Sequence, residues 1–166
     1  MEQKPLGLYI HIPYCIHKCG YCDFNSHPIK HDEMDDYINA LAIEIKHYAK
    51  IYSSTYYIST IFLGGGTPTT LTTFQLDRIF KECVNEFTIA SDAEITIEAN
   101  PATINLDQLK SIRHAGYNRI SIGVQSFDKA ELKLLDRAHG PEEIHSTVDL
   151  ARKAGFDNLS IDLMFA

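Results

Sequence analysis

Two segments, AGYNRISIG (residues 115–123) and AGFDNLSID (residues 154–162), repeat one pattern that indicates how the chain folds. In each, a helical pattern ends at a glycine, Gly116 or Gly155, the residue type that most easily adopts the backbone needed at a helix C-terminus. A short apolar strand follows, with a serine at the same position in both copies. A repeated helix–glycine–strand unit predicts an α/β fold with a parallel sheet, either a barrel or a doubly wound sheet.

Other apolar segments extend this pattern over the whole chain. The sequence predicts five strands, over residues 8–12, 59–63, 94–98, 119–123 and 158–162. Between them, apolar residues at helical spacing predict helices over 33–50, 74–87, 106–115, 128–138 and 141–154. The first helix is expected to bury Met34, Tyr37, Ile38, Leu41, Ile45 and Tyr48, and the second Leu76, Ile79, Phe80, Cys83, Val84 and Phe87. Helices that separate strands indicate crossover connections, which parallel strands require.

Composition narrows the class of protein. The chain has 166 residues and a net charge of −7, which suits one domain and argues against a basic surface for nucleic acid. No apolar run is long enough to span a membrane, and residues 1–10 lack the apolar region of a signal peptide. Four cysteines without such a signal indicate a reducing compartment, the cytoplasm, in which thiols serve as ligands or nucleophiles.

The carboxyl ends of the predicted strands carry an unusual set of groups. The first strand leads into a cysteine-rich loop and the second into GGGTP (64–68), while the next three end at polar residues: Glu98 and Asn100, Gln125, and Asp162. Because parallel α/β folds place their chemistry at the carboxyl ends of the strands, we expect one site here.

The loop after the first strand holds three cysteines in the spacing C-x3-C-x2-C: Cys15, Cys19 and Cys22. Three thiolates can bind three irons of a cubane cluster and leave the fourth iron open to a small molecule. A zinc site completed by His17 or His11 is an alternative, as are cysteines that bind no metal. Cys83, on the apolar face of its helix, is interpreted as a core residue.

This spacing, with Tyr21 just before the last cysteine, resembles the radical S-adenosylmethionine (SAM) superfamily, and the resemblance covers essentially the whole chain. Within it, several segments resemble the oxygen-independent coproporphyrinogen III oxidase-like group: GGGTPT (64–69), IEANP (97–101), ISIGVQSF (120–127) and IDLMFA (161–166). CDFNSH (22–27) is similar to the heme chaperone branch of that group.

The resemblance implies a partial parallel (β/α)6 TIM-like barrel. Five of its six strands are visible, so residues 1–166 are expected to be the N-terminal part of a radical SAM core domain, truncated after the fifth strand, with its C-terminal remainder absent. It also implies a [4Fe-4S] cluster on the three cysteines with exchangeable SAM at the open iron, and heme as bound cargo. In this superfamily an electron from the cluster cleaves SAM to a 5′-deoxyadenosyl radical.

The resemblance further implies which residues contact SAM: Tyr9, Tyr21, Gly65, Gly66, Thr67, Glu98, Gln125, Arg137 and Asp162. The GGGTP residues would meet the amino-acid end of SAM through backbone groups, and Asp162 would bind ribose hydroxyls. Each has a plainer alternative: a tight turn at GGGTP, a solvated strand end at Glu98, a surface pair at Arg137 and core packing for Tyr9 and Tyr21. His11 and His17 could tune the loop through hydrogen bonds.

One position separates the branches of the group. The oxidase branch carries a further cysteine two residues after the third, where this chain has Phe24. We therefore expect a heme chaperone that delivers heme to acceptor proteins, with heme or porphyrin, heme-accepting proteins and an electron donor as partners. The alternatives are coproporphyrinogen III oxidation and another radical SAM reaction, so whether the protein is an enzyme stays open. The heme site is expected in the absent C-terminal part.

Overall fold

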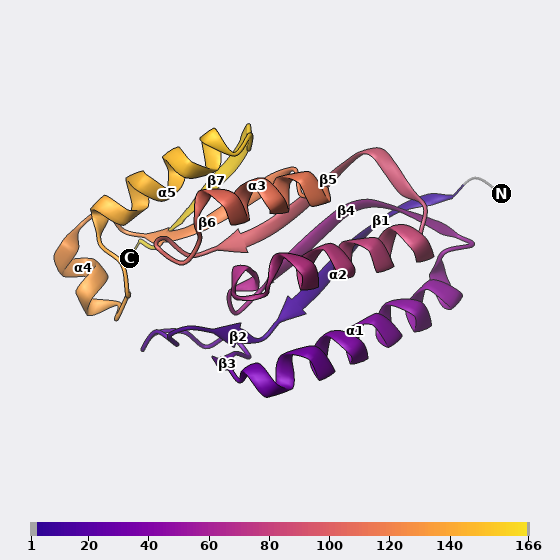
Figure 1. Cartoon of the computed structure of the whole chain (residues 1–166), viewed down its shortest axis with the longest axis horizontal. Helices are drawn as coiled ribbons and strands as arrows, with labels where there is room; N and C mark the ends of the chain where they lie inside the picture. Colours follow the sequence, from indigo (N-terminus) through magenta and orange to yellow (C-terminus); the bar gives the residue numbers. More distant parts are fainter. Residues whose placement is uncertain (1–2, 166) are drawn as a thin grey trace.

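A computed structural model of the chain describes residues 3–165 and contains a parallel sheet of five strands (Figure 1). The strand order is β1-β4-β5-β6-β7, so the strands follow one another across the sheet as they do along the chain. Their bounds are β1 Lys4–Ile12, β4 Tyr56–Gly65, β5 Ile89–Ala99, β6 Arg119–Gln125 and β7 Asn158–Leu163. The predicted α/β class and all five predicted strands are confirmed.

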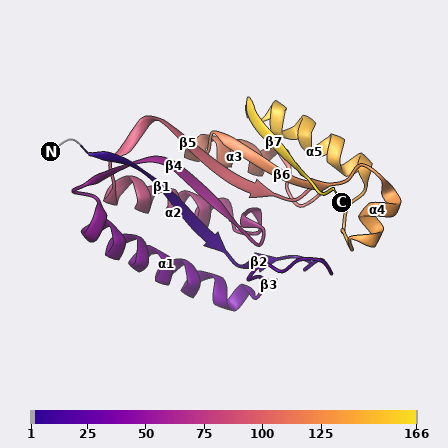
Figure 2. The same ribbon diagram turned by 180° about the vertical axis from the view of Figure 1, so that it is seen from behind.

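Helices lie along one face of this sheet. Their bounds are α1 His31–Tyr52, α2 Thr73–Glu86, α3 Leu106–Ala115, α4 Lys129–Leu134 and α5 Pro141–Lys153, with a short 3-10 helix, η1, over Pro68–Thr70. Helices α1, α2, α3 and α5 lie in front of the strands in Figure 1 and behind them in Figure 2. Within residues 3–165 the opposite face of the sheet therefore carries no helix.

The two faces of the sheet differ in polarity because side chains alternate along each strand. In β5, Ile95 and Ile97 are buried in the core. Between and after them, Thr96 and Glu98 point to the other face, where Thr96 accepts a hydrogen bond from Arg119. Polar side chains therefore lie on the face opposite the core, and Glu98 is the one nearest the carboxyl end of β5.

The repeated glycines end their helices as predicted. Gly116 and Gly155 have φ of +120° and +92°, a region that favours glycine. The aromatic residue after each glycine, Tyr117 or Phe156, is fully buried. Each copy therefore turns at a glycine and anchors the next strand with a buried ring.

Some predicted details are wrong. Tyr48 and Val84 are exposed, because the inward faces of α1 and α2 are rotated away from them; α1 buries Ala42 and Ala49 instead. The helix predicted over 128–138 ends at Leu134, since Asp136 adopts a positive φ of 54° and the chain turns there.

One feature of the chain was not predicted. A two-residue parallel pair, β2 (Tyr14–Cys15) and β3 (His27–Pro28), closes the base of the cysteine loop.

Among residues 3–165, no helix has the length and apolar character needed to cross a membrane.

Candidate functional site

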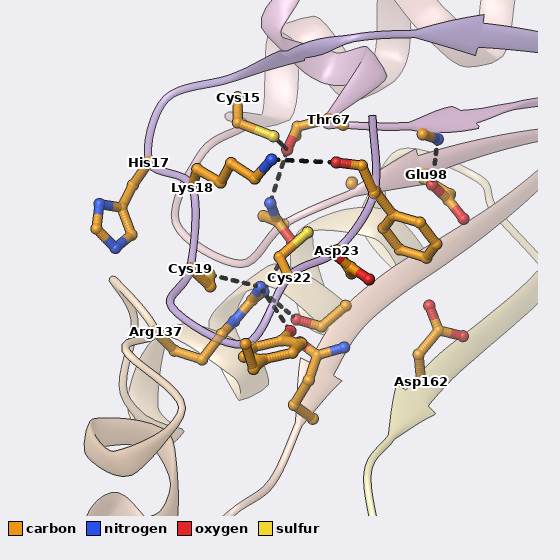
Figure 3. Close-up of a pocket in the computed structure, with 18 residues that line it drawn as sticks. Cys15, His17, Lys18, Cys19, Cys22, Asp23, Thr67, Glu98, Arg137 and Asp162 are labelled. Atoms are coloured by element: carbon orange, nitrogen blue, oxygen red, sulfur yellow. Dashed lines mark hydrogen bonds between the residues drawn. The ribbon is translucent and has the colours of Figure 1, made fainter. Parts of the chain in front are cut away.

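A cavity of about 480 Å³ opens at the carboxyl ends of the strands (Figure 3). Every residue that the sequence predicted for the site lines this cavity, except Tyr9. The lining residues from that set are Cys15, Cys19, Cys22, Tyr21, Gly65, Gly66, Thr67, Glu98, Gln125, Arg137 and Asp162. Residues far apart in the sequence are therefore brought together at one place.

The cysteine loop is tied to the GGGTP turn by backbone hydrogen bonds. The Gly66 N–H donates to the Ile12 carbonyl at 2.7 Å, and the Thr67 N–H donates to the Tyr14 carbonyl at 2.7 Å. A Cβ on Gly66 would lie 2.7 Å from the Tyr14 oxygen, so only glycine permits this approach. The loop is also held from within, because Lys18 Nζ donates to the carbonyls of Phe24 (3.1 Å) and Ser26 (2.9 Å).

The three loop thiols are free and face the cavity. Cys15 is buried, whereas Cys19 and Cys22 are half-buried. Among residues 3–165 no three His, Cys, Asp or Glu side chains converge closely enough for a single metal ion. Both histidines of the zinc alternative are engaged elsewhere, His11 with the Asn25 carbonyl at 2.8 Å and His17 with Asp136 at 3.0 Å.

The donor set fits an iron–sulfur cluster better than a single ion. A cubane spreads its thiolate ligands over three irons and accepts protein hydrogen bonds on its sulfur ligands. Here three free thiols line one cavity, and two already meet donors: Thr67 Oγ1 to Cys15 Sγ at 3.8 Å, and Arg137 Nη1 to Cys19 Sγ at 3.4 Å. The residues present are therefore compatible with the [4Fe-4S] cluster that the spacing predicts.

Glu98 is held at the exit of β5 by the glycine turn. Its Oε2 accepts the Gly65 N–H at 3.1 Å. Burial raises the pKa of this carboxyl above its ordinary value, and the charge of Asp162 adds to the rise, while the Gly65 N–H works against it. The N–H groups of Gly65, Gly66 and Thr67 are all used within the chain, so this turn has no free backbone donor from these three residues for a ligand carboxylate. A ligand amine donates, and the turn can meet it only through carbonyl oxygens.

The ends of β6 and β7 supply two further groups. Ser121 Oγ donates to the Asp162 carboxylate at 3.1 Å and 3.3 Å, which fixes that side chain from below. Gln125 has a φ of 65°, unusual for a residue other than glycine, and its buried Oε1 has no partner among the described residues. A strained backbone and an unsatisfied buried acceptor in a residue that lines a cavity are typical of a ligand-binding position.

Arg137 reaches the cavity from the turn after α4. Its Nη2 donates to the Gly123 carbonyl at 2.6 Å and to Asn100 Oδ1 at 2.8 Å. Its Nη1 lies 3.5 Å from the Tyr21 hydroxyl. Burial raises the pKa of that hydroxyl, partly offset by the positive charge of Arg137. Arg137 thus joins the loop to β5 and β6 and is more than a surface pair.

Tyr9 lies outside the cavity lining. Its ring is 57% exposed and stacks on Phe62, and its hydroxyl lies 3.0 Å from His11 Nδ1. Core packing, the plainer alternative for Tyr9, is wrong, because β1 directs this side chain to the polar face of the sheet. Its contact with SAM stays a prediction. Cys83 is a core residue, as predicted, and is fully buried.

The cavity also includes residues that were not among the predicted cofactor contacts: Lys18, Asp23, Phe24, Ala99 and Gly123. Asn100, expected at the site as a strand end, and His17, expected near the loop, line the cavity as well. A signal was available for Gly123, because Asp162 takes its place in the second copy of the repeat. Lys18 bonds carbonyls within its own loop, and His17 bonds Asp136, which is 119 residues away; no local sequence pattern indicates these bonds.

Comparisons with known proteins show which family the chain resembles. The family model of the radical SAM superfamily matches residues 9–166. The heme chaperone HemW of Escherichia coli is 44% identical over 165 residues, covering 99% of this chain and 43% of that protein. The oxygen-independent coproporphyrinogen III oxidase of E. coli is 38% identical over 164 residues, covering 98% of this chain and 36% of that protein.

A solved structure is similar as well. The E. coli coproporphyrinogen III oxidase HemN, described as a radical SAM enzyme, has a TM-score of 0.89 and 38% identity, covering 98% of this chain and 38% of that one. The predicted resemblance to this superfamily and to its oxidase and heme chaperone members is confirmed. The chain spans less than half the length of the curated relatives it matches.

Proposed function

The chain belongs to the radical SAM superfamily, and from this premise we propose that Cys15, Cys19 and Cys22 hold the [4Fe-4S] cluster which membership implies. Support comes from their position together on one cavity wall, with donors already directed at two of the sulfurs. Such a cluster, when bound, supplies one electron and an open iron for SAM. Residues 1–166 would then form the N-terminal part of a radical SAM core domain.

We propose that SAM occupies the remaining cavity. The carbonyls of the GGGTP turn would accept from its amine, since an amine donates and the N–H groups of Gly65, Gly66 and Thr67 cannot accept. Asp162, oriented by Ser121, would accept from ribose hydroxyls, and the unpaired Oε1 of Gln125 would take a donor from the ligand. Glu98, Tyr21 and Arg137 complete the contacts. Tyr9, whose ring stacks on Phe62, is proposed to pack near SAM at the edge of the cavity.

As the function of the complete protein we propose heme binding and delivery to acceptor proteins. The single observation that carries this proposal is Phe24. Its exposed ring lines the cavity next to the loop, at the position where the oxidase branch has a cysteine. The identity to the heme chaperone HemW of E. coli, 44%, supports the same proposal. The proposed cluster would need an electron donor as a partner. A reducing location, the cytoplasm, is proposed because all four cysteines are free of disulfides.

A second candidate is oxidation of coproporphyrinogen III. It is favoured by the TM-score of 0.89 to HemN and by the cavity, which holds all but one of the positions predicted for SAM. In that case the residues above would orient SAM for hydrogen abstraction from a porphyrinogen side chain.

One experiment separates the two candidates. The complete gene product is reconstituted anaerobically with iron and sulfide, then given heme, or coproporphyrinogen III with SAM and a reductant. Stoichiometric heme binding without decarboxylated product supports the chaperone. Decarboxylated product in repeated turnovers would contradict it and establish the oxidase. Phe24→Cys, compared with Phe24→Leu, tests whether the branch position alone changes the outcome.

A further inference from the structure

Asn100 lies at the exit of β5, between two residues that reach the loop cysteines. Its Nδ2 donates to Thr67 Oγ1 at 2.8 Å. Its Oδ1 accepts from Arg137 Nη2 at 2.8 Å. One side-chain amide therefore joins the glycine turn after β4 to the arginine that follows α4.

The direction of each hydrogen bond in this series follows from which groups can donate and which can accept. An arginine only donates, so the Asn100 oxygen must face Arg137 and its nitrogen must face Thr67. The Thr67 hydroxyl, having accepted that bond, has its own hydrogen left to donate. The acceptor within reach is Cys15 Sγ at 3.8 Å, while Arg137 Nη1 donates to Cys19 Sγ at 3.4 Å.

The surroundings are built to hold this arrangement. Thr67 is 2% exposed, so water does not compete for its hydroxyl. A Cβ at Gly123 would lie 2.9 Å from Asn100 Oδ1 and 3.4 Å from Arg137 Nη2, so the absence of a side chain there makes room for both. The carbonyl of Gly123 accepts from Arg137 Nη2 and holds the guanidinium in place.

We propose that Asn100 is a positioning residue that aims two hydrogen-bond donors, Thr67 Oγ1 and Arg137 Nη1, at the sulfurs of Cys15 and Cys19 and so raises the reduction potential of the cluster. This inference rests on the proposed cluster. Hydrogen bonds to ligand sulfurs stabilise the more negative, reduced state, which is one of the ways a protein tunes such clusters.

The test compares Asn100→Ala with Asn100→Asp in the reconstituted complete gene product. Alanine removes both bonds. Aspartate still accepts from Arg137 but cannot donate to Thr67, whose hydroxyl then turns to the carboxylate and away from Cys15. Asn25→Ala, an exposed asparagine between the loop cysteines and β3, is the matched control. The readout is the midpoint potential from an EPR-monitored redox titration without SAM.

For Asn100→Ala we expect the reduced-to-oxidised ratio at a given potential to fall about tenfold, a one-electron shift of about 59 mV to lower potential. Asn100→Asp should also shift to lower potential, because it loses the bond to Thr67 and adds a negative charge, and Asn25→Ala should not shift. An unchanged potential in an iron-loaded Asn100 variant would overturn the inference. Loss of iron from both Asn100 variants with the fold retained would also overturn it, because Asn100 would then hold the ligands in place. A wild type that forms no cluster would instead refute the proposed function.

Discussion

The two repeated glycines offer a matched pair of substitutions, Gly116→Ala and Gly155→Ala. Both positions have positive φ, +120° and +92°, so backbone strain in each alanine variant should lower the free energy of unfolding by about 1–2 kcal/mol. Both also lower the entropy of the unfolded chain, which returns about 0.4–1 kcal/mol. These two terms are similar at the two sites and nearly cancel when the variants are compared with each other.

Packing distinguishes the two sites. A Cβ at residue 116 would lie 2.9 Å from Cζ of Phe80 and closer still to Cε1, and this ring is itself packed against Tyr117. A Cβ at residue 155 would have Arg113 Cγ as its nearest neighbour, at 3.9 Å, which is an ordinary contact. Overpacking costs about 1–3 kcal/mol, so Gly116→Ala should be less stable than Gly155→Ala by that amount.

Urea unfolding followed by circular dichroism measures this difference. With a slope of about 2 kcal/mol/M, a difference of about 2 kcal/mol separates the two midpoints by about 1 M. A slope equal to that of the wild type shows that the folded and unfolded states are otherwise unchanged. Coincident midpoints for the two variants, or a lower midpoint for Gly155→Ala, would refute the packing argument.

Three further predictions concern the site and the core. Burial raises the pKa of Glu98, so the folded chain keeps this proton at pH values where the unfolded chain has lost it. Stability should therefore fall as pH rises from the ordinary glutamate pKa through the folded value; Glu98→Gln should flatten that part of the urea-midpoint profile, and a profile like the wild type's would count against the shift. Burial raises the pKa of Cys83 to about 12, so in native protein this thiol should resist alkylation that modifies Cys22, and react only in urea; equal labelling of the two on peptide mapping would contradict its core position. Ser121→Ala should weaken SAM binding to the reconstituted protein about fivefold in equilibrium dialysis, from loss of about 1 kcal/mol in one hydrogen bond, whereas an unchanged affinity would mean that Asp162 needs no support.

The strands, the cap glycines and the place of the site were predictable because each depends on a local pattern. Apolar strand segments that alternate with amphipathic helical segments indicate a parallel sheet. In a parallel sheet the carboxyl ends of all strands lie at the same edge. The glycine in each repeat was predictable because a strand that follows a helix directly needs a tight turn with positive φ, which few other residue types adopt. The face of β1 on which Tyr9 lies could also be predicted from the sequence. Side chains alternate along a strand, and Ile10 and Ile12 occupy the opposite, buried face.

Other features depend on contacts that no local pattern records. The bond between Asn100 and Thr67 joins residues 33 apart, and Lys18 acts on carbonyls across its own loop. Helical spacing predicted that Tyr48 is buried, because it groups apolar residues on one face of the helix. The spacing does not show how much of that face the neighbouring elements cover. Tyr48 instead stacks on Tyr52 along the outside of α1.

The most direct test of the proposed cluster and its open iron is the response of the reduced, reconstituted protein to SAM, followed by EPR together with iron analysis. We expect a [4Fe-4S] signal with about four irons per chain, and a change in its shape when SAM is added. The signal should be lost in Cys15→Ser, Cys19→Ser and Cys22→Ser but kept in Cys83→Ser. A signal that SAM leaves unchanged would contradict an open iron at this cavity. A protein that takes up one zinc and no iron would contradict the cluster itself.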